Sequence, residues 1–129
     1  QGVANLVAAA RPGGTVSVLT RNRAGLAMRA GMTGRWADAV RAFDAHTYRN
    51  RVGVDDARAD EPGEVAAALT SAGATVTAWY GVRLWSDHLD GEPPAGPDLA
   101  ALLAAEAQAG RRDPYRAVCA LTHTLAVVQ

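Results

Sequence analysis

Hydrophobic and polar residues follow a helical period at the start of the chain and then a strand period. The first stretch, Gly2–Arg11, carries apolar side chains at helical spacing, namely Val3, Leu6, Val7 and Ala10. This spacing predicts a helix, which the Pro12-Gly13-Gly14 turn ends. Strict alternation over Thr15–Thr20 then predicts a half-buried strand. A helix that leads through a short turn into a strand is typical of the second half of a β-α-β unit, so we expect the chain to begin inside a fold.

Glycines interrupt the stretch after this strand, and its apolar spacing favours short helical pieces between Leu26 and Trp36. Apolar residues three and four apart over Trp36–Phe43 predict one or two helical turns. His46–Arg51, with the sequence HTYRNR, is the most basic stretch of the chain. Val52–Asp60 has no clear period, so we interpret this region as a surface loop.

The next two elements are a helix and a strand. Glu61 and Glu64 flank Pro62 at the start of the helix, where proline fits the first turn and carboxylates face the positive end of the helix dipole. Gly73 is the expected end of this helix. Alternation over Ala74–Leu84 predicts a strand that places four side chains on one face: Val76, Ala78, Tyr80 and Val82.

The chain ends with one more helix and one more strand. Asp98 is the expected N-cap of the helix, which runs to about Ala109. Residues Gly110 to Pro114 end it, and Tyr115–Val128 alternates as a last strand. The length and this order of elements predict one α/β domain.

Composition and charge place the chain among ordinary globular domains. Hydrophobic residues make up 49% and charged residues 20%, which excludes wholesale disorder. There are 13 basic and 13 acidic residues, so net charge predicts no general attraction to nucleic acid or membrane. Every basic residue is an arginine, which we interpret as the coding bias of a GC-rich genome.

The cysteine, the histidines and the hydropathy of the chain indicate its compartment and whether a membrane or a metal ion is expected. The single cysteine, Cys119, excludes an internal disulfide and fits a reducing cytoplasm, where we expect the protein. No apolar run is long enough to span a bilayer, so no membrane partner is expected. His46, His88 and His123 lack metal-ligand spacing, and we expect no metal site.

The stretch Trp79–Leu89, WYGVRLWSDHL, contains the candidate chemistry of the chain. An apolar alternation stops at Gly81 and is followed by a polar cluster among aromatic residues: Arg83, Ser86, Asp87 and His88. Polar side chains among aromatics at the end of a strand are typical of a pocket wall.

Each candidate residue allows a functional and a structural interpretation. Arg83 could clamp an anion, positioned by Asp87, or the two could form an ion pair that fixes the strand end if the chain turns helical after Leu84. His88 is a candidate base or a surface histidine, and His123 is better explained as a hydrogen-bonded core residue. The HTYRNR stretch could contact phosphates, with Tyr48 stacking on a base, or be a solvated loop.

With these elements placed, the sequence resembles the C-terminal half of class I S-adenosylmethionine-dependent methyltransferases. Arg11-Pro12-Gly13-Gly14 before a strand is similar to the L-(R/K)-P-G-G turn of that family. Three later segments are similar, in order and spacing, to the patterns YN-x-x-G-L, GVRVFHDYL and EPY…GRYIH of the tRNA 5-carboxymethoxyuridine methyltransferase group. They are Arg21-Asn22-Arg23-Ala24-Gly25-Leu26, Gly81–Leu89, and Asp113-Pro114-Tyr115 with His123.

The resemblance implies an α/β fold, with the last three strands of a Rossmann-like methyltransferase sheet and flanking helices. In that fold the final strand is antiparallel and lies between the two before it, which places Tyr115–Val128 between Thr15–Thr20 and Ala74–Leu84. Residues 1–129 would form the substrate-side part of the domain, and the half that binds the methyl donor would be absent. S-adenosylmethionine is then the expected cofactor of the full-length protein and not of this chain alone.

The implied function is methyl transfer to an oxygen or nitrogen nucleophile, on a modified tRNA uridine or a small carboxylate-bearing molecule. No catalytic residue is assigned, and the candidate substrate-binding residues are Arg83, Asp87, His88, Arg21, Asn22 and Tyr115. The alternative is a non-catalytic binding or assembly module derived from this fold. Without the first half, Thr15–Thr20 is an unprotected edge, so we expect self-association through it or through an uncovered apolar face.

Overall fold

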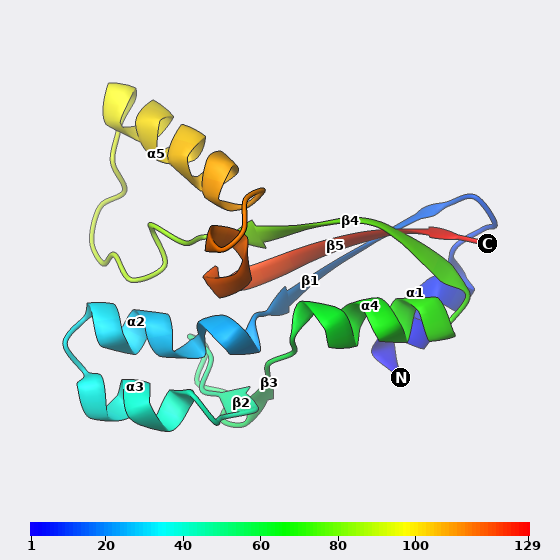
Figure 1. Cartoon of the computed structure of the whole chain (residues 1–129), viewed down its shortest axis with the longest axis horizontal. Helices are drawn as coiled ribbons and strands as arrows, with labels where there is room; N and C mark the ends of the chain where they lie inside the picture. Colours follow the sequence, from blue (N-terminus) through cyan, green and yellow to red (C-terminus); the bar gives the residue numbers. More distant parts are fainter.

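The computed structural model describes all 129 residues, and a three-stranded sheet lies at its centre (Figure 1). The strands are β1 (Thr15–Arg21), β4 (Ala74–Val82) and β5 (Leu121–Val128), in the spatial order β1-β5-β4. Because β5 is antiparallel to both neighbours, β1 and β4 run parallel to each other. The predicted place of the last strand, antiparallel and between the two earlier ones, is confirmed.

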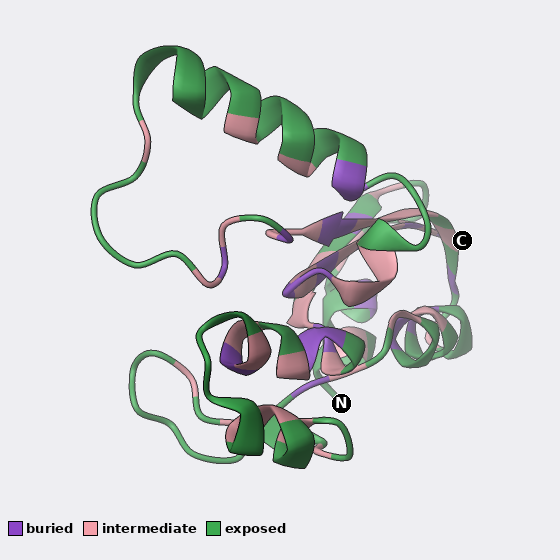
Figure 2. Cartoon of the chain, turned by 60° about the vertical axis from the view of Figure 1, so that its left-hand side comes forward, coloured by how far each residue is buried: buried purple, intermediate pink, exposed green.

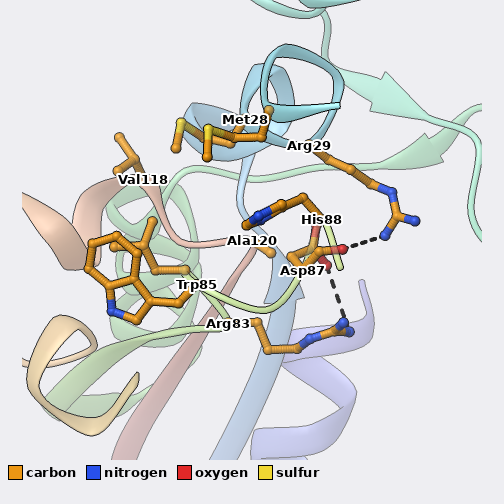
Figure 3. A pocket seen from close by; sticks show the side chains of 10 residues that line it. Met28, Arg29, Arg83, Trp85, Asp87, His88, Val118 and Ala120 are labelled. Carbon is orange, nitrogen blue, oxygen red and sulfur yellow. Dashed lines mark hydrogen bonds and ion pairs between the residues drawn. The ribbon is translucent and has the colours of Figure 1, made fainter. Parts of the chain in front are cut away.

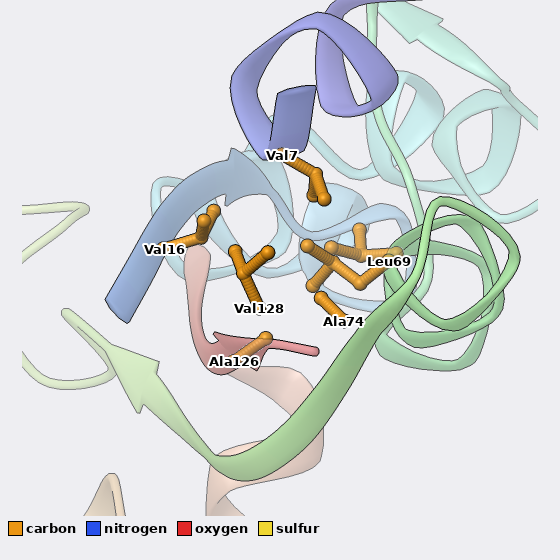
Figure 4. Packing of buried hydrophobic residues seen from close by; sticks show 7 residues of the cluster. Val7, Val16, Leu69, Ala74, Ala126 and Val128 are labelled. Atoms are coloured by element: carbon orange, nitrogen blue, oxygen red, sulfur yellow. The ribbon is translucent and has the colours of Figure 1, made fainter. Parts of the chain in front are cut away.

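Helices α1 (Gly2–Ala9) and α4 (Pro62–Ser71) pack on one face of this sheet and form the main core. Figure 4 shows Val7 of α1 and Leu69 of α4 beside the strand residues that they bury. Every second residue of β5 is buried on this face: Thr122, Thr124, Ala126 and Val128. The start of α4 is fixed by a capping box between Glu61 and Glu64, as the sequence predicts.

A bulge in β4 corrects the predicted alternation of that strand. Val76 lies opposite the buried Ala126, whereas Ala78 lies opposite Leu125, on the other face of the sheet. The register shifts between Val76 and Ala78, because one extra residue is inserted there. The four side chains expected on one face are therefore divided, and Val76 alone joins the α1 and α4 core.

The last strand is shorter than predicted. Residues Tyr115–Val118 form the 3₁₀ helix η2, and β5 begins only at Leu121. The cause lies in a distant side chain: the amide of Asn22 donates to the carbonyl oxygens of Ala117 (2.9 Å) and Cys119 (2.8 Å). These bonds satisfy the backbone of a turn where the sequence pattern alone allows a strand.

Three glycines let this turn approach the neighbouring elements. A Cβ at Gly81 would lie 2.5 Å from Cys119 Sγ, and one at Gly25 would lie 2.9 Å from the carbonyl oxygen of Val118. A Cβ at Gly110 would collide with the carbonyl oxygen of Gly81. The ends of β1, β4 and α5 (Gly96–Ala109) therefore meet around η2 because these positions lack side chains.

Two further helices and a pair of short strands lie together below the end of the sheet at which β1 and β4 stop (Figure 1). Helices α2 (Leu26–Met32) and α3 (Trp36–Ala42) pack against each other, and the 3₁₀ turn η1 (Arg23–Gly25) precedes them. The predicted loop after them contains a two-residue strand pair, β2 (Thr47–Tyr48) with β3 (Ala57–Arg58). Such short strands carry no periodic signal, so the sequence pattern missed them.

Helix α5 stands away from the sheet and is mostly exposed (Figure 2). It begins at Gly96 with Ala95 as its N-cap, so Asp98 lies in the first turn and is not the predicted N-cap. Its carboxylate still faces the positive end of the helix dipole. No helix of the chain is both long and apolar enough to cross a membrane.

The thiol of Cys119 is fully buried where these elements meet. Burial, together with the negative charge of Glu106, raises the pKa of Cys119 to about 11 from its ordinary value of 9.0. At a pH between these two pKa values, the thiol is ionised in the unfolded chain and protonated in the folded chain. We therefore expect the free energy of unfolding to fall as the pH rises from about 9 to about 11, which urea denaturation at several pH values measures.

Cys119→Ala is the matched variant for this prediction. It lacks the thiol and keeps every other ionisable side chain of the protein. The free energy of unfolding of the unchanged chain minus that of Cys119→Ala should fall between pH 9 and pH 11. A constant difference across this range would contradict the prediction.

Candidate functional site

The parallel strands β1 and β4 end at the same edge of the sheet, where an arginine terminates each of them. Arg21 is the last residue of β1, and Arg83 directly follows β4. Open α/β sheets place ligands at this carboxyl edge. Arg83 has a φ of 63°, in the left-handed region that costs energy for a residue with a side chain. This turn ends β4 two residues before the predicted Leu84 and directs the chain away from the sheet.

The carboxylate of Glu106, on α5, holds the segment that follows Arg83. It accepts hydrogen bonds from the backbone N–H groups of Leu84 (2.8 Å), Trp85 (2.9 Å) and Ser86 (2.9 Å). The Ser86 hydroxyl donates to it as well, at 2.8 Å. Four donors on one carboxylate fix this loop to α5. Asp87, which follows the loop, is therefore positioned by α5 and not by the sheet alone.

Asp87 is the centre of the site. Its carboxylate is paired with Arg21 (3.5 Å) and Arg83 (3.7 Å), and the residue is 7% exposed. Arg29 and Arg51 donate to its backbone carbonyl oxygen. Figure 3 shows Asp87 between Arg29 and Arg83. We call these residues the Asp87 cluster: Arg21, Arg29, Arg51, Arg83 and Asp87.

The structure brings Arg83 and Asp87 together without the helix on which the predicted pairing depended. The segment after Leu84 consists of bends and turns. Arg83 therefore reaches Asp87 through its left-handed backbone and through the loop that Glu106 holds. Its side chain remains 40% exposed, so its guanidinium group can contact a ligand as well as Asp87.

A small cavity of about 40 Å³ lies beside the Asp87 cluster. His88 and Trp85 line it together with Met28 and Met32 of α2 (Figure 3). The space is enough for a few water-sized groups and too small for a whole substrate molecule. The cavity can receive at most one functional group of a ligand.

The other predicted site residues lie at different places. Asn22 is fully buried and uses its amide on backbone groups around η2, so it supports the edge of the sheet and does not line the cavity. Tyr115 packs beside Trp85, with 6.1 Å between ring centroids, and is also outside the cavity lining. Of the six candidates, Arg83, Asp87 and His88 line it, and Arg21 is joined to it through Asp87.

Sequence reasoning missed three contributors. Arg29 and Arg51 hold the backbone of Asp87, and Glu106 holds the loop before it. Arg51 belongs to the basic HTYRNR stretch, which was a detectable signal. Nothing near Arg29 or Glu106 in the sequence marks them, because each acts on residues far away in the chain.

The remaining histidines lie away from this cluster. His123 is half-buried on β5, where its Nε2 is 2.7 Å from the Ser17 hydroxyl. His46 contacts Arg23, with 2.7 Å between His46 Nδ1 and Arg23 Nη1. No group of three or more His, Cys, Asp or Glu side chains is arranged to hold a metal ion.

The edge of the sheet thus presents partly exposed guanidinium groups around a buried carboxylate, an arrangement suited to anions. No model of a known protein family matches the chain, and no curated protein matches it.

Proposed function

We propose that these residues form the substrate-side portion of an S-adenosylmethionine-dependent methyltransferase. The acceptor is an oxygen or nitrogen nucleophile on a molecule that carries an anionic group, such as a modified tRNA uridine or a small carboxylate. The observation that supports this proposal is the strand order β1-β5-β4, with the antiparallel last strand between two parallel ones. The Asp87 cluster lies at the carboxyl edge of those parallel strands, where an acceptor would bind.

The residues present do not fit the methyl donor. The cavity beside Asp87 is far smaller than the roughly 300 Å³ that a ligand of that size needs. The larger pocket nearby is lined by five arginines, which repel a sulfonium cation. The role proposed for this chain is therefore confined to the acceptor.

Arg83 is the residue that we expect to hold the acceptor. Its guanidinium group can bind a carboxylate or phosphate through two N–H groups, while Asp87 limits its orientation. An acceptor held in this way loses rotational freedom before the reaction, which is the main contribution that such a site can make. His88 lies beside it and can contact the acceptor in the cavity.

The test uses the protein from the whole reading frame that encodes these residues. It is incubated with methyl-labelled S-adenosylmethionine and a cell extract separated into RNA, protein and small molecules. We expect label to enter one anionic fraction. Arg83→Gly, which relieves the left-handed backbone and removes the guanidinium group, should raise the acceptor KM by about tenfold or more.

Arg111→Gly is the control, because Arg111 is exposed and lies outside the Asp87 cluster. Its KM should equal that of the unchanged protein. Absence of transfer to every fraction, together with absence of donor binding in calorimetry, would overturn the proposal. That result would favour the alternative, a non-catalytic module derived from the same fold.

A further inference from the structure

A second pocket, of about 340 Å³, lies between α2, α3 and β2, next to the Asp87 cluster. Figure 1 shows these elements side by side below one end of the sheet. Arg21 and Arg29 of the Asp87 cluster form part of its lining, and the methyltransferase proposal gives no role to the other lining residues. Its volume is in the range of sites that enclose a small molecule.

Arginine dominates the lining of this pocket. Five guanidinium groups line it, from Arg21, Arg29, Arg35, Arg41 and Arg49. Asp38 supplies the one carboxylate of the lining. Both Arg35 (3.1 Å) and Arg41 are paired with that carboxylate, so one positive charge of the three groups stays uncompensated. Arg35 and Arg41 are also more than half exposed, which leaves donors free for a ligand.

The inner wall of the pocket contains an unused donor. The Nε atom of Arg21 is buried and has no hydrogen-bond partner in the chain. Its guanidinium group lies 5.4 Å from the ring centre of Tyr48, which also lines the pocket. A buried N–H group without an acceptor costs free energy, and an anion in the pocket is one way to satisfy it.

The sequence around the pocket has an excess of basic over acidic residues. Residues 21–51 contain seven of the 13 arginines of the chain and two aspartates, Asp38 and Asp44, while the whole chain has no net charge. The acidic partners of the other lining arginines lie outside the lining: Asp87 for Arg21, Asp90 for Arg29 and Asp55 for Arg49. The positive potential is therefore concentrated on the pocket side.

We propose that this pocket binds a small phosphorylated molecule. Planar guanidinium groups match the oxygen atoms of a phosphate, and several of them around one concave site can share its two negative charges. The volume of about 340 Å³ fits a small ligand, and Tyr48 is the single aromatic residue of the lining. An extended RNA strand would instead follow a groove and stack successive bases on several exposed aromatic faces. This binding does not depend on methyl transfer or on the donor.

The test is calorimetric titration of the 129-residue chain with inorganic pyrophosphate, AMP and citrate at low and moderate salt. We expect pyrophosphate and AMP to bind and citrate to bind at least about tenfold more weakly, because phosphate carries more charge on each group. Arg35→Gln combined with Arg41→Gln should weaken the binding of AMP by about thirtyfold, because two charge-assisted contacts are lost. Asp38→Asn should strengthen it several-fold, because it removes the carboxylate that competes with the ligand.

The control is Arg111→Gln combined with Arg112→Gln, which removes the same charge from exposed residues outside the pocket. It should leave the binding of AMP within about twofold of the unchanged chain, since distant exposed charges are screened. Circular dichroism of each variant verifies its fold. Equal weakening by both double variants would overturn the proposal, as would tight binding of a single-stranded RNA 12-mer with no binding of pyrophosphate or AMP.

Discussion

Gly81→Ala should lower the free energy of unfolding by about 3 kcal/mol or more, because the added methyl group has no space. Its Cβ would lie 2.5 Å from the buried Cys119 Sγ and 2.7 Å from the carbonyl oxygen of Arg116. The backbone of Arg116 cannot move freely, since its guanidinium group lies over the ring of Trp79, 4.0 Å from the ring centre, and is paired with Asp113. The strand end and η2 would have to separate.

Urea denaturation followed by circular dichroism measures this effect. Gly63→Ala is the matched control, because Gly63 lies in α4 and a Cβ there meets nothing within 4 Å. It should raise stability by up to about 1 kcal/mol, since alanine is the better helix former. A midpoint for Gly81→Ala equal to that of the unchanged chain would show that η2 does not pack against β4 as described.

The sequence predicts the elements that have a clear period and misses the contacts between distant residues. Alternation identified Thr15–Thr20 and most of Ala74–Leu84, and the capping signals identified α4. The same alternation continued falsely through Tyr115–Val118, because no local signal shows that Asn22 holds that backbone in a turn. The position of the last strand was predicted from a family resemblance and not from its pattern.

The candidate site, too, could be predicted only where its residues are close together in the sequence. Arg83 and Asp87 are four residues apart, so their pairing was visible in the sequence, although the helix invoked for it does not form. The contribution of Arg29 and Arg51 depends on α2 and the β2 region folding back over the end of the sheet. The spacing of residues along the sequence does not indicate which distant segments lie side by side in the fold.

Helix α5 holds the loop that leads to Asp87 through two groups, a side-chain carboxylate and a backbone carbonyl. Glu106 lies in the predicted helix that runs to about Ala109, and its carboxylate is the acceptor for the turn that leads to Asp87. The indole N–H of Trp85 also donates to the carbonyl oxygen of Ala105, at 3.3 Å. The otherwise exposed helix α5 is thus a support for the site.

Glu106→Ala should lower the free energy of unfolding by roughly 2–4 kcal/mol and loosen the loop before Asp87, because four donors lose a charged acceptor. Glu106→Gln keeps the shape and one acceptor oxygen but turns an NH₂ group toward the donors, so its loss should be intermediate. Amide hydrogen exchange of Leu84, Trp85 and Ser86 gives a direct readout, with faster exchange expected at these three positions.

Glu92→Ala is the control for these variants, because Glu92 is exposed in the loop between β4 and α5 and makes no ion pair. It should change neither stability nor exchange.

The Glu106→Ala variant has a second consequence, since removing this negative charge should lower the raised pKa of Cys119 toward the value that burial alone sets. Unchanged exchange at Leu84, Trp85 and Ser86 in Glu106→Ala would mean that the sheet edge, and not α5, positions Asp87 and its arginines.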